Sequence, residues 1–404
     1  MDSEIKRRIA QIRRGEVPEG YKRIQRDIVP KDWTIKSLAE VCDNFSYGMN
    51  AAAKTYDGYN KYIRITDIDD NNHIYTGLDI VSPDADLELK YRVQENDILF
   101  ARTGATVGKT YLYNKNDGIL FFAGFLIRAN VPMDNSYYVY EQTLTRRYLN
   151  WVRIMSQRSG QPGINAQEYG TYTFPYCCVE EQQRIAAILT TQDKVIELKE
   201  KRLAEKQRQK KYLMQQLLTG KKRLPGFNKT WNTVELGEIF DYIQPTKYLV
   251  KTTDYDNAYK TPVLTAGKTF ILGYTSETKD VYTNVPVVIF DDFTTATQYV
   301  DFPFKVKSSA LKILAVKDGF NIFFAYEAMQ LIRFAVGGHE RHWISQYSCL
   351  TVDVPEIGEQ TAIAQVLSTA DREISLLRQG IEQEKQKKKA LMQLLLTGIV
   401  RTTA

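Results

Sequence analysis

The sequence is poor in the residues that build disulfide frameworks, metal sites and membrane spans. Among its 404 residues are four cysteines and three histidines. Cys42, Cys177, Cys178 and Cys349 form no Cys-x-x-Cys pair, which argues against both a disulfide framework and a zinc or other metal site. No apolar run reaches the length of a transmembrane helix, and the charged amino terminus does not resemble a signal peptide. We therefore expect a cytoplasmic protein.

The chain also lacks a large excess of either charge. It has 54 Lys and Arg residues against 48 Asp and Glu, which gives a formal net charge of +6. This small excess permits nucleic-acid binding without requiring it. A hydrophobic content of 43% and a length of 404 residues are enough for two or three domains with cores of their own.

One stretch of the sequence occurs twice. Residues 181–223 align without a gap with residues 359–401, at an offset of 178 (359 minus 181), and 19 of the 43 aligned positions are identical. Both copies contain LMQ followed by LLTG at the same place, which a lysine-rich composition alone does not explain. We interpret the stretch as an internal repeat.

Each copy of the repeat has the four-three spacing of apolar residues that is typical of a coiled coil. A proline precedes each copy and a Thr-Gly pair lies near its end, as expected for one long helix per copy. The two helices could pair with each other or pack separately on their own domains; we favour antiparallel pairing. The apolar seam residues are Ile185, Leu189, Ile196, Leu203, Leu213, Leu217, Ile363, Leu367, Ile374, Leu377, Ile381, Leu391 and Leu395.

Two strand-rich segments alternate with the repeated helices. Each begins with a Trp-x-x-x-x-Leu-(Ala/Gly)-Glu-(Val/Ile) phrase, at Trp33 and at Trp231, and each has strand-like runs before a late helical stretch. The predicted fold is α+β: two mixed, strand-rich domains joined by two long helices that form an antiparallel coiled coil, with a pseudo-twofold repeat. The expected boundaries are a basic helix or arm at 1–24, domains at 25–177 and 225–355, and spacer helices at 178–224 and 356–404.

The most suggestive loop is TGATVGKT at 103–110. A phosphate-binding P-loop needs four residues between its first Gly and the Gly-Lys pair, and only three separate Gly104 from Gly108, so an ATPase is not favoured. A glycine-rich loop flanked by basic residues suits a nucleic-acid backbone instead. We predict DNA contacts for Arg102, Thr103 and Lys109, although a tight hairpin with a solvated lysine remains an alternative.

Other polar loops add further candidates. The loop at 159–167 carries amides that can bond adenine in the major groove, although a polar turn has the same composition. The phrase GGHERHW at 337–343 contains His-x-x-His, but no Cys or carboxylate pattern completes a set of metal ligands. The candidate DNA-contacting residues of these loops are Gln161, Asn165, Gln167, Lys247, Lys268, Thr295, His339 and Arg341.

The sequence contains no recognisable catalytic constellation. It has no Gly-x-Ser-x-Gly elbow, no clear Cys/His pairing and no Gly-x-Gly-x-x-Gly fingerprint. Asp291 and Asp292 follow a strand-like run, as nuclease carboxylates often do, but no lysine lies nearby in the sequence. We interpret this pair as the cap of a turn.

The order of these parts resembles the DNA-specificity (S) subunit of type I restriction-modification systems. The resemblance is carried by a proline followed by Glu-Gln-x-x-Ile-Ala at the start of each repeat, by LLTG at its end, and by the phrases YIRITDI (62–68) and NDILFARTGATVGKT (96–110). It covers nearly the whole chain. The second domain departs from the first because it lacks the GATVGKT phrase.

The resemblance implies a non-catalytic chain with two target-recognition domains, each reading one half of a split, asymmetric site in double-stranded DNA. The paired helices, on the order of 50 Å long at 1.5 Å per residue, would set the unread spacer between the half-sites. Two methylation (M) subunits would dock on the helices and hold restriction (R) subunits. S-adenosylmethionine, ATP and magnesium would belong to those partners, and no cofactor to this chain.

Three alternatives differ from this interpretation. The chain could be a helical scaffold that binds only proteins, or an enzyme with an unrecognised nuclease or methyltransferase site. It could also be the specificity subunit of a related single-chain or methyltransferase-only system.

Overall fold

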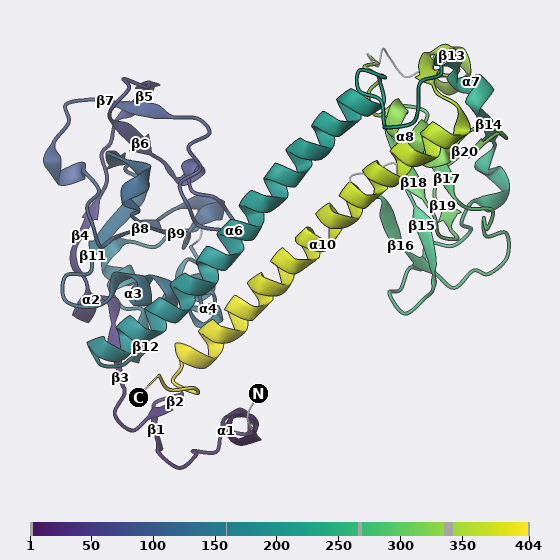
Figure 1. The fold of residues 1–404 in the computed structure, drawn as a ribbon. Helices are drawn as coiled ribbons and strands as arrows, with labels where there is room; N and C mark the ends of the chain where they lie inside the picture. Colours follow the sequence, from purple (N-terminus) through teal and green to yellow (C-terminus); the bar gives the residue numbers. More distant parts are fainter. Residues whose placement is uncertain (1–2, 159, 266–268, 335–341, 403–404) are drawn as a thin grey trace. The chain divides into compact units, whose positions relative to one another are not determined.

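A computed structural model describes residues 3–158, 160–265, 269–334 and 342–402. The chain folds as two compact units, and each long helix contributes one part to each unit (Figure 1). Unit 1 comprises Met1–Leu198 and Glu382–Ala404, and unit 2 comprises Lys199–Ile381. None of the described helices is long and apolar enough to cross a membrane.

The central sheet of unit 1 has four strands in the order β4-β11-β8-β9, each antiparallel to its neighbours. All five residues of β8, the predicted strand DILFA, are buried. A separate pair, β3 with β12, joins the beginning of the domain to its end. The strands of unit 1 are β1 (Tyr21–Ile24), β2 (Asp27–Pro30), β3 (Thr34–Ser37), β4 (Asp43–Tyr47), β5 (Ala52–Thr55), β6 (Lys61–Ile63), β7 (Val81–Asp84), β8 (Asp97–Ala101), β9 (Thr110–Leu112), β10 (Leu120–Phe122), β11 (Leu126–Asn130) and β12 (Thr173–Tyr176).

Short helices cover this sheet, and side-chain caps fix where several of them begin. Asn135, Thr145 and Asn165 accept hydrogen bonds from the first turns of α3, α4 and α5. The short helices of unit 1 are α1 (Ser3–Arg13), α2 (Leu38–Val41), α3 (Ser136–Gln142), α4 (Arg146–Met155) and α5 (Ala166–Gly170), and the 3-10 turns are η1 (Ile65–Asp67), η2 (Leu89–Tyr91), η3 (Gly104–Thr106) and η4 (Lys115–Asp117).

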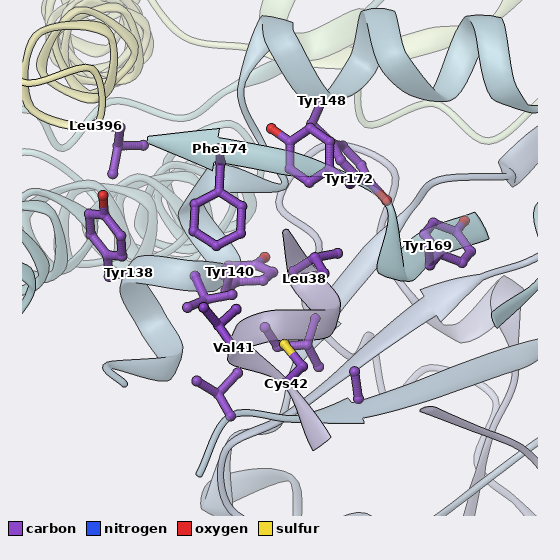
Figure 2. Packing of buried hydrophobic residues seen from close by; sticks show 14 of the residues in the cluster. Leu38, Val41, Cys42, Tyr138, Tyr140, Tyr148, Tyr169, Tyr172, Phe174 and Leu396 are labelled. Atoms are coloured by element: carbon purple, nitrogen blue, oxygen red, sulfur yellow. The ribbon is translucent and has the colours of Figure 1, made fainter. Parts of the chain in front are cut away.

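Tyrosines make up much of the core between these helices and the sheet (Figure 2). Tyr138, Tyr148, Tyr169 and Tyr172 are buried around Phe174. Their hydroxyls bond to backbone carbonyls; that of Tyr148, for example, donates to the Gly108 oxygen at 3.0 Å. Buried aromatic rings contribute apolar area, and paired hydroxyls avoid a desolvation penalty.

Unit 2 repeats the topology of unit 1 with a different sequence. Its sheet has the order β14-β20-β17-β18, so β17 takes the place of β8 and β18 that of β9. The pair β13 with β21 corresponds to β3 with β12. The strands are β13 (Asn232–Glu235), β14 (Phe240–Ile243), β15 (Thr261–Leu264), β16 (Ile271–Thr275), β17 (Val287–Asp291), β18 (Thr297–Val300), β19 (Lys305–Val306), β20 (Leu311–Val316) and β21 (Thr351–Val354); the short helices are α7 (Leu236–Ile239), α8 (Ile322–Met329) and α9 (His342–Ser345), with 3-10 turns η5 (Pro245–Tyr248) and η6 (Tyr347–Cys349).

The two repeats form the long helices α6 (Val179–Leu217) and α10 (Ile357–Leu395), each of 39 residues. Within unit 1 their segments run antiparallel, since Glu181 contacts Arg401 and Asp193 contacts Lys388. In unit 2, Lys206 likewise contacts Glu373. The predicted seam residues are all buried or half-buried.

Each helix segment also packs on the domain of its own unit. Ile185 and Leu189 of α6 belong to one apolar cluster with Leu395, Leu396 and the tyrosine core of unit 1. In unit 2, Leu217 clusters with Ile363, Leu367 and the domain core. Within each unit, pairing of the two helix segments and packing of these segments on the domain therefore occur together and are not alternatives.

Candidate nucleic-acid interface

Two loops that the sequence offered as separate candidates meet in unit 1. Thr103 forms a β-bridge with Gly163, and the Ile164 N–H donates to the Arg102 oxygen at 2.9 Å. Gly104 has a φ of +75°, and a Cβ atom there would lie 3.1 Å from the Gln161 Nε2. Glycine thus permits both the backbone conformation and the close approach of the second loop. We call residues 102–109 and 160–167 together the loop pair of unit 1.

Arg102 is held within the loop pair by its backbone and by an aromatic ring. Its N–H donates to the Phe125 oxygen at 3.0 Å, and its guanidinium lies 4.9 Å from the centre of the Tyr47 ring. The Tyr47 hydroxyl accepts a hydrogen bond from the Ala166 N–H at 3.2 Å, which fixes the ring against the second loop. The arginine is half-buried, and Phe125 beside it is exposed.

Lys109 has partners inside the unit. Its Nζ donates to the Ile68 oxygen at 2.9 Å and forms an ion pair with the exposed Asp70, and only 9% of its side chain is exposed. A DNA phosphate would compete with Asp70 for this ammonium. The predicted phosphate contact therefore remains a prediction, and the structure adds an internal role for the residue.

The remaining candidate DNA-contacting residues of unit 1 differ in how far their side chains are exposed to solvent. Thr103 is half-buried at the bridge between the loops. Asn165 is the N-cap of α5: its side-chain oxygen accepts from the Glu168 N–H at 2.9 Å. Gln161 and Gln167 are exposed. We infer that Asn165 positions the loop, whereas the two glutamines present their amides to solvent.

Unit 2 has a corresponding pair of chain segments. The His342 N–H donates to the Asp292 oxygen at 3.1 Å, as the Ile164 N–H does to Arg102 in unit 1. The Trp343 N–H donates to Asp292 Oδ1 at 2.9 Å. The loop after β17 and the first residues of α9 therefore meet at the same place in the topology as the loop pair of unit 1.

The aspartates after β17 have structural partners. Asp291 accepts from the Phe293 N–H at 3.2 Å and from the Thr294 hydroxyl, which confirms the interpretation of Asp291 as a turn cap. Asp292 is instead paired with the buried Lys312, 3.6 Å away. The lysine that the sequence seemed to lack comes from β20, a neighbouring strand in the sheet.

The other candidate DNA-contacting residues of unit 2 lie in separate segments of the chain. Thr295 lies in the turn after Asp291 with a φ of +57° and is half-buried. Lys247 is exposed in η5, where its Nζ lies 5.9 Å from the centre of the Tyr248 ring. Lys268, His339 and Arg341 lie outside the described residues.

A repeated ionic cluster at the helix ends was missed by sequence reasoning. Glu181 accepts from Trp33 Nε1 at 3.0 Å and from Arg401 at 2.9 Å. In unit 2, Glu359 accepts from Trp231 Nε1 at 3.2 Å and from Arg223 at 2.6 Å. The recurring Trp phrase, Glu-Gln phrase and Thr-Gly-x-x-Arg ending could have suggested this cluster, because each contributes one member.

Burial and ionic contacts shift the pKa of the Glu181 carboxyl in opposite directions. Burial raises the pKa of its carboxyl, but the hydrogen bonds from Arg401 and Trp33 outweigh that effect, and the net pKa is lowered. The carboxylate is therefore the stable form at neutral pH, and it binds the segment that follows α10 to the beginning of α6.

The glutamine of each Glu-Gln phrase has an equally repeated role. Gln182 Oε1 accepts from the Asn135 N–H at 3.0 Å, and Gln360 Oε1 accepts from the Asn321 N–H at 2.8 Å. Asn135 and Asn321 are the N-caps of α3 and α8. Each long helix is thus joined at its first turn to the late helix of its own unit.

Two lysines at polar seam positions form a second repeated cluster. Lys388 contacts Glu141 and Asp193, both at 2.8 Å, in unit 1. Lys210 contacts Glu327 at 2.8 Å and Asp371 at 2.7 Å in unit 2. The lysines and the aspartates recur at the repeat offset of 178, whereas the glutamates lie in the diverged domains and carry no sequence signal.

Among the described residues no group of three or more His, Cys, Asp or Glu side chains is placed to hold a metal ion. The clusters that are present join helices to domains. The loop pair of unit 1, by contrast, combines a half-buried cation with exposed aromatic rings and amides.

A comparison with known families agrees with this arrangement of two equivalent units. The model of the family described as type I restriction modification DNA specificity domain matches the chain twice, at residues 30–207 and 228–385. The chain belongs to this family. Specificity subunits are the non-catalytic DNA-recognition components of type I systems, in agreement with the expectation that this chain is not an enzyme.

The specificity subunit has relatives in both bacteria and archaea. It is 51% identical over 140 residues to the type I restriction enzyme EcoR124I/EcoR124II specificity subunit of Escherichia coli, a match that spans 33% of this chain and 34% of that protein. It is 26% identical over 347 residues to the type I restriction enzyme MjaVIII specificity subunit of Methanocaldococcus jannaschii, covering 76% of this chain and 80% of that one.

A solved structure has the same fold. The crystal structure of the type I restriction-modification system S subunit from M. genitalium matches with a TM-score of 0.63 at 14% identity, covering 90% of this chain and 96% of that chain. The prediction of two strand-rich domains with two long helices is confirmed. The specificity subunit is therefore an α+β protein built from two repeats.

Proposed function

We propose that this specificity subunit binds double-stranded DNA through the loop pair of unit 1 and through the corresponding region of unit 2, where the loop after β17 meets α9, and that each unit reads one half of a split, asymmetric site. The observation that carries the proposal is that the two units share one topology but differ in the residues of the loop at the same place in it. Where unit 1 has RTGATVGKT after β8, unit 2 has DFTTATQ after Asp291 in β17. Equivalent scaffolds with different contact residues suit two different short sequences.

The side chains of the loop pair in unit 1 fit a nucleic-acid ligand. Arg102 supplies a cation, Tyr47 and Phe125 supply exposed aromatic surface, and Gln161 and Gln167 supply amides. Cations neutralise phosphates or bond to base edges, and amides bond to bases. The glycines allow the backbone to approach a groove wall closely.

The long helices have a separate part in this proposal. At about 1.5 Å per residue, a helix of 39 residues extends for roughly 58 Å, so the pair can set the length of the unread spacer. We propose that two M subunits dock on the helices and that R subunits are held through them. The methyl donor, ATP and magnesium belong to those partners, and the assembly acts on DNA in the cytoplasm.

A mobility-shift assay tests whether the loops bind DNA. The subunit assembled with its methylation subunits should bind cognate duplex, and the triple variant Arg102→Ala, Gln161→Ala, Arg341→Ala should lose most of that binding. A control with Lys90→Ala and Lys115→Ala removes two exposed charges outside the loop pair and the long helices and should bind as the native assembly does.

Two results would contradict the proposal. Unchanged DNA binding by the triple variant would favour a helical scaffold that binds only proteins. Nuclease or methyltransferase activity of the isolated chain would instead favour an enzyme with its own catalytic site.

A further inference from the structure

Arg102 differs from the other half-buried arginines of unit 1. Each of the others lies beside a carboxylate, whereas no described residue forms an ion pair with Arg102. A half-buried guanidinium without an anion is uncommon, because its desolvation is not compensated. The paired arginines are Arg8 with Glu4 (2.9 Å), Arg64 with Asp67 (2.8 Å), Arg128 with Asp97 (3.8 Å), Arg147 with Asp27, and Arg401 with Glu181 (2.9 Å).

The hydrogen-bonding capacity of Arg102 is also unused. Its Nε is buried and has no partner within the described part of the chain. No described residue accepts a hydrogen bond from its terminal nitrogens either, although its backbone is bonded on both sides. The guanidinium carries five N–H donors in a planar fork. Within the described residues, no side-chain or backbone acceptor bonds to these donors.

The arginine is positioned by the Tyr47 ring instead of by an ion pair. The guanidinium lies 4.9 Å from the ring centre, and the Tyr47 hydroxyl is itself fixed by the Ala166 N–H. Stacking on an aromatic face orients the plane of a guanidinium without occupying its in-plane donors. The residue therefore presents a fork of fixed orientation, beside the exposed side chains of Phe125 and Gln161.

A fork of this kind suits a planar acceptor pair better than an isolated phosphate. A guanidinium can also bond a phosphate through two N–H groups, but a mobile lysine ammonium can make that contact as well, so a phosphate does not require a fork of fixed orientation. Guanine is the base that presents two acceptors, O6 and N7, side by side in the major groove, and arginine bonds both.

We propose that Arg102 reads a guanine in the half-site bound by unit 1, donating to O6 and N7. The inference rests on the proposed DNA-reading function and makes it specific to one contact. The topologically equivalent residue of unit 2 is Asp292, which is buried and already bonded to Lys312 and to the Trp343 N–H. The contact therefore has no counterpart at the equivalent, described position of unit 2.

The test is a binding study of the assembled subunit with its methylation subunits on cognate duplexes. Each guanine of the two half-sites is replaced in turn by 7-deazaguanine, which lacks the N7 acceptor. Because 7-deazaguanine removes one of the two acceptors of a bidentate contact, one position in one half-site should lose about half of the contact's 1–3 kcal/mol, which weakens native binding roughly 2- to 12-fold. This part needs no protein variant.

Arg102→Ala should then lose that sensitivity. It should bind the cognate duplex weakly, show no further loss with 7-deazaguanine at the sensitive position, and tolerate other base pairs there. Arg102→Lys keeps the charge but not the planar fork, and should restore at most part of the sensitivity at that position. Arg146→Ala, which removes an exposed arginine at the start of α4, should retain the full 7-deazaguanine effect.

Several results would overturn the inference. One such result is that Arg102→Ala weakens binding to all duplexes equally and reduces the slope of log K against log salt concentration by about one. That result would mean that Arg102 contacts a phosphate of the DNA backbone. If the guanine sensitivity persisted in both Arg102 variants, or native binding had no such guanine, the assignment would be wrong. A native assembly without any sequence preference would contradict the proposed function itself, which distinguishes the two failures.

Discussion

Lys210 and Lys388 show how single residues hold each unit of the specificity subunit together. Each lies at a polar seam position of a long helix and forms an ion pair with a buried glutamate of the adjacent domain. Burial raises the pKa of Glu141, and the Lys388 ammonium offsets only part of that rise. The lysine therefore stabilises a carboxylate that the interior disfavours.

Lys388→Met is expected to lower the free energy of unfolding of the intact chain by about 3–5 kcal/mol near pH 8, because it leaves Glu141 charged and buried without its cation. The folded-state pKa of this carboxyl lies above its unfolded value. At pH values above the unfolded-state pKa, the charged carboxylate therefore lowers the free energy of unfolding. This loss disappears as the pH falls through the folded-state pKa. Denaturant unfolding should show a smaller deficit at pH 5 than at pH 8.

The neighbouring Lys387 provides a matched control for this prediction. Its side chain is mostly exposed and lies 3.7 Å from Glu384, so Lys387→Met should change stability by less than about 1 kcal/mol. Adding Glu141→Gln to Lys388→Met should recover much of the loss at pH 8. A deficit for Lys388→Met that did not change with pH would contradict the role assigned to Glu141.

Sequence reasoning at the residue scale succeeded where a pattern repeats and failed where a partner comes from a diverged segment. The seam residues follow from their spacing, and the structure buries or half-buries all of them. Glu141, which pairs with Lys388, lies in a domain that shares little sequence with its counterpart. Likewise, Lys312 reaches Asp292 only because β20 lies beside β17.

At the scale of elements, the long helices were predictable and the domain elements were only partly so. The apolar run at 119–129 looks like one strand, yet it forms β10 and β11 with a turn between them. At that turn the Leu126 N–H donates to the Ala123 oxygen, and a Cβ at Gly124 would lie 3.3 Å from the Met49 oxygen. The late helical stretch is divided in the same way, because Thr145 caps a new helix after α3 ends at Gln142.

The pairing of helix segments in unit 1 can be tested by a disulfide. Leu189 of α6 and Leu391 of α10 pack in the same apolar cluster, so cysteines at both positions should cross-link under oxidising conditions. The exposed Cys178 and Cys349 are first replaced by serine. The chain is cleaved by a protease between positions 189 and 391. On a non-reducing gel, the two fragments should then migrate together if the disulfide has formed.

A second cysteine pair serves as the control for the cross-link. Gln393 is exposed on α10, so cysteines at positions 189 and 393 should remain reduced under the same conditions. Absence of a disulfide between positions 189 and 391 would contradict the antiparallel packing described for unit 1.

At the scale of the whole molecule, the internal repeat predicted more than any single motif did. Its order of domain, helix, domain, helix indicated both the α+β fold and the family. The loop pair of unit 1 was not predictable as a pair, because Thr103 and Gly163 lie 60 positions apart (163 minus 103) and are brought together only by the fold of the domain. Sequence reasoning named residues in both loops without bringing the loops together.

The central claim is that two different readers, one per unit, act at a separation set by the paired helices. Sequencing of methylated sites in cells that express the complete system tests it most directly, with the native subunit and with one heptad inserted into both α6 and α10. The native system should modify a bipartite, asymmetric motif with a fixed unread spacer. The insertion adds about 10 Å and should lengthen that spacer by up to about three base pairs, with both half-sites unchanged. A single continuous motif, or an unchanged spacer after the insertion, would contradict the account.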